Sequence, residues 1–164
     1  MNSLRAEAWD KCSVQEKLDI LQTICNYECE RDLGCRTPVI VAGYMERDEV
    51  KGDYNDLTNT ICLPVEDIEN DPASFVLSTV LHETRHAYQH AVVKAFNAIE
   101  DRLSEEDLDL SCFRFMLSYR DSMDNYSDGR DDFYTYYGQY IESDSREWAA
   151  WKILHEYDIF LYPD

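Results

Sequence analysis

Two histidines and a glutamate stand together in the string His82-Glu83-Thr84-Arg85-His86. On an α-helix the two histidines lie one turn apart on the same face, about 6 Å along the axis, so that both imidazoles can reach one tetrahedral metal ion. Glu83 follows the first histidine directly and can act on a water molecule bound to that metal. The chemistry that this HExxH string supports is metal-assisted hydrolysis.

The surrounding sequence predicts the helix that such a string requires. Asp71 is a good N-cap, Pro72 suits the first helical position, and no proline or glycine interrupts residues 73–103. At about 100° per residue, apolar residues gather on one broad face, and His82 and His86 point away from it. The members of this predicted core face are Leu77, Val80, Leu81, Thr84, Tyr88, Ala91, Val92 and Ala95. We therefore expect one side of the helix to pack and the other to present the histidines to a cleft.

A second group of residues follows downstream at helical intervals: Glu142, Ser145, Trp148 and Ala149. Together with the HExxH string, this group resembles the gluzincin metallopeptidases, several families of which carry Glu-x-x-Ala on a second helix, with an aromatic and a small residue one turn later. The order of a helix, a strand pair and then the HExxH helix is also similar, and the likeness covers residues 35–155 in layout. It implies a zincin-like fold that binds Zn²⁺ through His82, His86 and Glu142.

The resemblance also implies an activity. Glu83 would be the general base that takes a proton from zinc-bound water, and the substrate would be a peptide bond in a protein or peptide. The chain departs from the family pattern in two places: Ser145 replaces the usual alanine, and Arg146 stands where many of these families have aspartate or asparagine. Asp144 is a candidate for the supporting role of that missing residue, or for the third ligand in place of Glu142.

Two tyrosines and a third histidine lie near the two motifs in the sequence. Tyr137 and Tyr140 shortly precede Glu142 and are candidate donors to the oxyanion of the transition state, although packing is the ordinary role of a tyrosine. On a continuous helix His90 lies about 12 Å from His82 along the axis, which is too far to share one ion comfortably. We therefore expect His90 to lie at the surface or at the edge of the cleft.

The remaining sequence predicts an α+β fold that is mostly helical, with a small antiparallel sheet before the HExxH helix. Short β-branched segments at 38–42 and 59–63 indicate strands, and the polar residues 46–55 between them indicate a turn. The other expected elements are helices at 14–33, 104–117 and 133–155 and an exposed acidic loop at 121–132. No repeat or linker divides the chain, so residues 1–164 are expected to form one zincin-like metallopeptidase domain.

Composition and charge predict the cellular location of the protein and the classes of partner that it can bind. The net charge is −19, from 34 acidic and 15 basic residues, and such a surface repels phosphate backbones, so nucleic acid is not an expected partner. The apolar runs are too short to span a bilayer and the first residues lack a signal-peptide pattern, so we expect a cytoplasmic protein without membrane contact, with unconventional export left open. The six cysteines form no CxxC pair and are expected to be reduced, mostly buried thiols. The oligomeric state is left open.

Two alternatives to a general zinc metallopeptidase remain at this point. One is a binding or structural protein that keeps the zincin scaffold without turnover, although the intact Glu83 is unnecessary in such a protein. The other is a toxin or effector whose peptidase acts on one host protein. Neither the residue types nor their spacing separates these from the first hypothesis.

Overall fold

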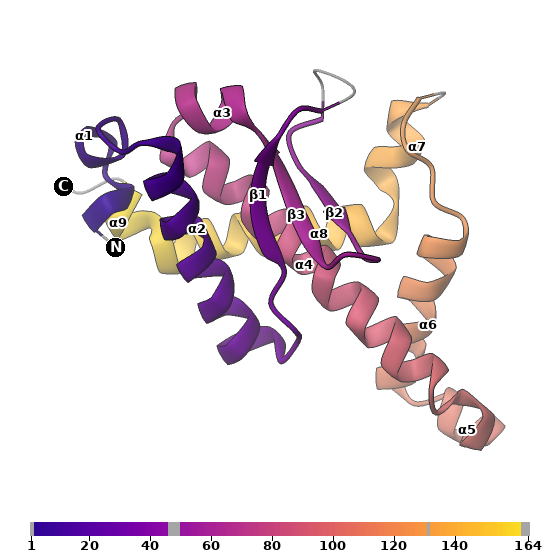
Figure 1. Cartoon of the computed structure of the whole chain (residues 1–164). Helices are drawn as coiled ribbons and strands as arrows, with labels where there is room; N and C mark the ends of the chain where they lie inside the picture. The colour runs from indigo at the N-terminus through magenta and orange to yellow at the C-terminus, as the bar shows by residue number, and fades with distance from the viewer. Residues whose placement is uncertain (1, 46–49, 131, 162–164) are drawn as a thin grey trace.

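The computed structural model describes residues 2–45, 50–130 and 132–161, and in it helices surround one small sheet (Figure 1). The α-helices are α1 (Ala6–Trp9), α2 (Val14–Glu28), α3 (Val65–Asn70), α4 (Ala73–Asn97), α5 (Glu105–Leu108), α6 (Ser111–Asp124), α7 (Phe133–Gly138), α8 (Tyr140–Lys152) and α9 (Asp158–Leu161). Short 3₁₀ or π-helical turns are η1 (Asn2–Leu4), η2 (Cys29–Leu33), η3 (Glu100–Arg102) and η4 (Ile153–Tyr157). The strands are β1 (Val39–Gly43), β2 (Asp53–Asn55) and β3 (Thr60–Pro64). The expected α+β class with predominant helix is confirmed.

The sheet is mixed, so the prediction of an antiparallel sheet is wrong in part. The strand order is β1-β3-β2, with β1 parallel to β3 and β2 antiparallel to β3. The reason lies in the segment predicted as a turn: its end forms β2, which makes a hairpin with β3 and leaves β1 to pair with the other side of β3. Residues 46–49 of that segment lie outside the described residues.

A side chain, and not a fourth strand, contacts the outer edge of β1. Gln22 of α2 donates from Nε2 to the carbonyl oxygen of Pro38 over 3.0 Å, and its Oε1 accepts the backbone N–H of Ile40 at 2.8 Å. The primary amide of Gln22 therefore presents to β1 the same donor and acceptor that a neighbouring strand would present.

Helix α4 is the central helix and packs beside α8, as Figure 1 shows in pink and yellow. Leu77, Val80 and Leu81 of its predicted core face are buried, but Ala95 near the end of that face is exposed, while Phe96 is buried. Towards its C-terminal end α4 packs against α6, where Val93 and Tyr119 share a second buried cluster and Phe96 contacts Phe113, so the buried face there differs from the predicted one. The helix ends at Asn97, within the stretch 73–103 that no proline or glycine interrupts.

Two further boundaries differ from the sequence prediction. The helix expected over 133–155 is interrupted at Gln139, whose backbone is extended (φ −61°, ψ 143°) and separates α7 from α8. The expected acidic loop at 121–132 begins as the last turn of α6, which continues to Asp124. Residue 131 of that loop lies outside the described residues.

A buried ion cluster joins α8 to the end of α2. The ammonium group of Lys152 lies 2.7 Å from Glu28 Oε2 and 2.8 Å from Glu156 Oε1, and it also pairs with Asp32. Both Lys152 and Glu28 are buried, and the hydroxyl of Tyr157 donates to Glu28 at 2.5 Å. Since buried charges are costly unless they are paired, this cluster fixes the relative position of the two helices.

None of the helices in the described ranges combines the length and the apolar character that crossing a membrane requires. The six cysteines are all free thiols, and Cys25 and Cys29 are fully buried. Cys25 Sγ lies 3.3 Å from the hydroxyl of Thr84 on α4, so that this thiol packs directly behind the HExxH string.

Candidate metal centre

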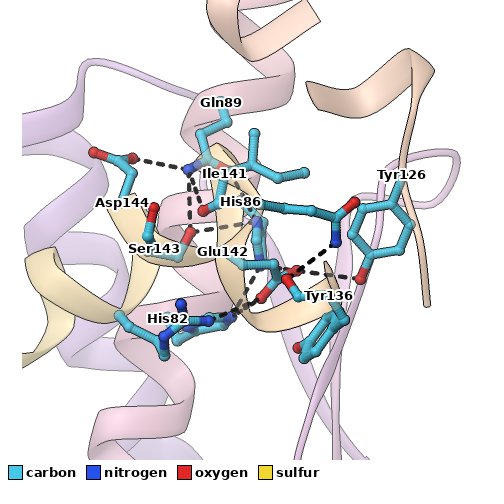
Figure 2. Close-up of polar contacts among 12 residues, drawn as sticks. His82, His86, Gln89, Tyr126, Tyr136, Ile141, Glu142, Ser143 and Asp144 are labelled. Carbon is cyan, nitrogen blue, oxygen red and sulfur yellow. Dashed lines mark hydrogen bonds and ion pairs between the residues drawn. The ribbon is translucent and has the colours of Figure 1, made fainter. Parts of the chain in front are cut away.

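Two helices bring three metal-binding side chains together. His82 and His86 project from α4 and Glu142 from the first turn of α8, and Figure 2 shows them converging. The two imidazole Nε2 atoms are 2.9 Å apart, His82 Nε2 is 3.3 Å from Glu142 Oε2, and His86 Nε2 is 3.5 Å from Glu142 Oε1. Residues separated by about sixty positions in the sequence therefore present one nitrogen or oxygen each to a common point.

The spacing of the two imidazole nitrogens and the Glu142 carboxylate oxygens fits a tetrahedral zinc ion. With metal–ligand distances of about 2.0–2.2 Å and tetrahedral angles, ligand atoms are separated by roughly 3.3 Å. The observed separations lie close to that value. Glu142 Oε2 is moreover buried and forms no well-aligned hydrogen bond among the described residues, its polar neighbours being His82 Nε2 at 3.3 Å and Arg146 Nη1 at 3.9 Å, so a cation can bind to it.

A fully buried glutamine sets the tautomer of His86. Gln89 Oε1 lies 2.8 Å from His86 Nδ1, so a proton on Nδ1 is donated to the amide oxygen and the lone pair stays on Nε2. The Gln89 amide nitrogen donates to the carbonyl of Ile141 (3.0 Å), to Asp144 Oδ2 (2.8 Å) and to Ser145 Oγ (3.1 Å). Gln89 thus connects one histidine of α4 to the turn of α8 that carries Glu142 (Figure 2).

Asp144 lies behind the centre, in contact with other side chains. Arg85 donates to both of its carboxylate oxygens, at 2.8 and 3.0 Å, and the hydroxyl of Tyr119 donates to Oδ2 at 2.7 Å. The candidate ligand group contains Glu142 and not Asp144. The structure therefore places Asp144 where a supporting residue would lie, holding α4, α6 and α8 together, and Arg85 pairs with it.

Two tyrosines other than Tyr137 and Tyr140, namely Tyr126 and Tyr136, contact Glu142. The hydroxyl of Tyr126, in the segment after α6, donates to Glu142 Oε1 over 3.1 Å. Burial and the nearby Glu142 carboxylate raise the pKa of both Tyr126 and Tyr136, which keeps their hydroxyls protonated as donors. Of the expected candidates, Tyr137 lies under the Arg146 guanidinium and Tyr140 packs against Tyr119.

Glu83 is buried next to the sheet. A Cβ atom on Gly52, just before β2, would lie 3.2 Å from Glu83 Cγ and 2.7 Å from Thr79 Cγ2, so only glycine allows the chain to pass this close. Burial, and secondarily the charge of Glu142, raises the pKa of Glu83 to about 7. At neutral pH this carboxyl group can therefore both accept and release a proton.

Burial and nearby charges shift the pKa values of the two histidines in opposite directions. Burial lowers the pKa of His86 to about 4, so this imidazole is neutral at physiological pH and can bind a metal. Burial is the largest influence on His82 and acts in the same direction, but contact with Glu142 and the charges of Glu83 and Glu142 together outweigh it and raise the pKa of His82 above its ordinary value. The histidines in turn lower the pKa of Glu142 in spite of its burial.

Other acidic or histidine groups lie apart from this centre. His90 Nδ1 is 3.6 Å from Asp56, with its ring against Tyr54, outside the group of three ligand atoms as expected. A second group of carboxylates, Glu28, Asp32 and Glu156, already surrounds the ammonium of Lys152. Within the described ranges, the histidine–glutamate centre is therefore the better candidate for a metal.

Comparisons of the chain with protein families, with curated proteins and with solved structures gave no match.

Two residues of the centre were missed by the sequence prediction. Gln89 stands three residues after His86, a spacing that brings side chains together on a helix and that could have identified it. Tyr126 follows a helix end in an acidic segment, and no local pattern points to it.

Proposed function

We propose that this protein is a zinc-dependent peptidase of zincin type, with His82, His86 and Glu142 as the metal ligands. The observation that carries the proposal is the convergence of the His82 and His86 imidazoles on the buried carboxylate of Glu142. Their nitrogen and oxygen atoms lie at separations that suit tetrahedral zinc. A third protein ligand on a separate helix, with Glu83 retained, is the arrangement of a catalytic and not of a closed structural site.

The chemistry divides between the ion and the side chains. Bound zinc would lower the pKa of its water towards about 7 and polarise the carbonyl of the scissile bond. Glu83 would take the proton of that water on its carboxylate and pass it to the leaving amine. Gln89 would hold His86 in the tautomer that binds metal. The hydroxyls of Tyr126 and Tyr136 would donate hydrogen bonds to Glu142 and orient its carboxylate.

The first test is of metal binding. The purified protein is dialysed against zinc and its metal content is measured by mass spectrometry, beside His86→Ala and the matched control His155→Ala. His155 is exposed and stacks on Trp151, so its removal leaves the centre intact. We expect one zinc per chain in wild type and in His155→Ala, and none in His86→Ala; equal zinc in all three proteins would show that the ligand assignment is wrong.

The second test is of turnover. Cleavage of a mixed peptide library is followed by mass spectrometry with and without 1,10-phenanthroline, for wild type and for Glu83→Gln. We expect chelator-sensitive cleavage that falls by at least about 10²-fold in Glu83→Gln while zinc content stays the same. A zinc-loaded wild type without any cleavage would favour the alternative of a zincin-fold protein that binds without turnover.

A further inference from the structure

Arg146 is a cation at the rim of the metal centre. It stands one turn after Glu142 on α8, and its Nη1 lies 3.9 Å from Glu142 Oε2, the same oxygen that faces His82. The guanidinium lies over the ring of Tyr137, 3.6 Å from the ring centre, and Nη2 donates to the carbonyl oxygen of Tyr137. The side chain is 27% exposed, so solvent and ligands reach it.

The charge of Arg146 is poorly matched by its surroundings. Among the described residues, Glu142 is the one carboxylate within 4.0 Å of this guanidinium, and it lies at the far end of that range. Once Glu142 serves as a metal ligand, its negative charge is shared with a divalent cation and balances Arg146 even less. A second cation beside a metal ion is unfavourable unless an anion joins them, because like charges repel strongly in a partly buried site.

The donors of Arg146 are arranged to receive such an anion. A guanidinium has five N–H groups, and the contacts above occupy Nη2 and only loosely Nη1. The ring of Tyr137 covers one face and holds the group in place through a cation–π contact. An arginine that is stacked on an aromatic ring and open along an edge is suited to bidentate binding of a carboxylate.

We propose that Arg146 binds a carboxylate group of the substrate next to the scissile bond, so that this peptidase selects acidic substrates or free C-termini. The inference rests on the proposed function and adds a substrate class to it. The same carboxylate chemistry has two sources, the C-terminus of a peptide and an aspartate or glutamate side chain.

The test measures binding, independently of turnover. Four peptide hydroxamates that ligate zinc are compared by calorimetry on zinc-loaded protein: one with a free C-terminal carboxylate, its C-terminal amide, and two amides that end in glutamate or in glutamine. We expect the carboxylate-bearing member of one pair to bind about tenfold more tightly than its neutral partner. The pair that shows the difference identifies the source of the carboxylate.

The variants separate recognition from a structural role in holding α7. Arg146→Gln should reduce the tenfold preference to less than about twofold, and Arg146→Lys should keep part of it, since an ammonium pairs with a carboxylate without the bidentate geometry. Arg120→Gln is the matched control: Arg120 is 29% exposed, pairs with Glu100 and lies over the ring of Phe96, far along α6. This control should keep the full preference.

Each outcome has a distinct meaning. If zinc-loaded wild type binds the two members of each pair equally, the inference is overturned and the proposed function stands. This comparison needs no variant to fold. A tenfold preference that persists in folded Arg146→Gln overturns it as well. If wild type takes up no zinc, the proposed function is refuted and the inference with it, and the metal content measured beforehand distinguishes this result from the others.

Discussion

Replacement of Gln89 by leucine removes one of the polar connections between the two helices that carry the proposed ligands, while it nearly preserves the volume of the side chain. Gln89 is fully buried and makes four polar contacts, one from His86 Nδ1 and three to α8 residues. Leucine can make none of them. The substitution therefore tests whether this amide orients the metal centre or only fills space between helices.

The expected effect follows from the groups that leucine leaves behind. The Nδ1–H of His86 loses its main acceptor and keeps only Ser145 Oγ at 3.3 Å. One buried donor that is poorly satisfied, together with the lost bonds to α8, should cost about 2–4 kcal/mol of unfolding free energy. Because His86 is then free to rotate or to change tautomer, zinc affinity should fall about 10- to 100-fold.

Two measurements separate these effects. Urea unfolding of the metal-free protein gives the stability, and competition with a chelator of known zinc affinity gives the metal affinity under conditions in which the variant is folded. The control is Gln15→Leu, since Gln15 is exposed and its side chain donates to Asp19 at the surface, so its loss should change stability by less than about 0.5 kcal/mol. Folded Gln89→Leu with zinc affinity within twofold of wild type would refute the reasoning.

Three other substitutions have definite expected outcomes. Asp144 is held below its ordinary pKa by the bonds from Arg85 and its neighbours, which outweigh burial, so its stabilisation is present above the unfolded pKa and lost as the pH falls through the folded one. Asp144→Asn should therefore lower the urea midpoint at pH 7, and the difference from wild type should shrink below about pH 4; a difference independent of pH contradicts this. Tyr126→Phe removes the donor to Glu142 Oε1 and should weaken zinc binding by no more than about tenfold in the chelator competition, whereas a total loss of zinc would make Tyr126 a ligand. Lys152→Met leaves Glu28 buried without its cation and should cost about 3–5 kcal/mol in urea unfolding, and adding Glu28→Gln should restore part of this loss if the unpaired charge is its cause.

Local features of the fold were predictable because the residues that determine them are neighbours in the sequence. The helix predicted from residue 14 begins there, with Ser13 and Glu16 forming a capping box at the start of α2, and both strand segments predicted from β-branched residues are strands. The parallel pairing of β1 with β3 was not predictable in this way. It depends on which side of the β2–β3 hairpin an earlier strand joins, and this pairing brings together segments that are distant in the sequence, with α2 packed against β1 and α4 against β2 and β3.

The candidate centre shows the same division. The spacing of His82 and His86 is a property of one helix, so their common orientation followed from the sequence. That Glu142 lies beside them was expected only from the likeness of its segment to a known motif, since no local rule brings together residues from α4 and α8. The helix breaks at Gln139, between α7 and α8. The one local signal of this break is the preceding Gly138, and the sequence prediction did not use it.

The capping of β1 by Gln22 has a consequence for how this protein behaves at high concentration. Open strand edges are templates on which further copies add by backbone pairing, and that process leads to fibrils. Here the first rung of that edge is already taken by a primary amide from within the same chain. A glutamine in the third turn of α2 thus protects an exposed, valine-rich strand against self-assembly, a role that lysine or proline more often has in proteins.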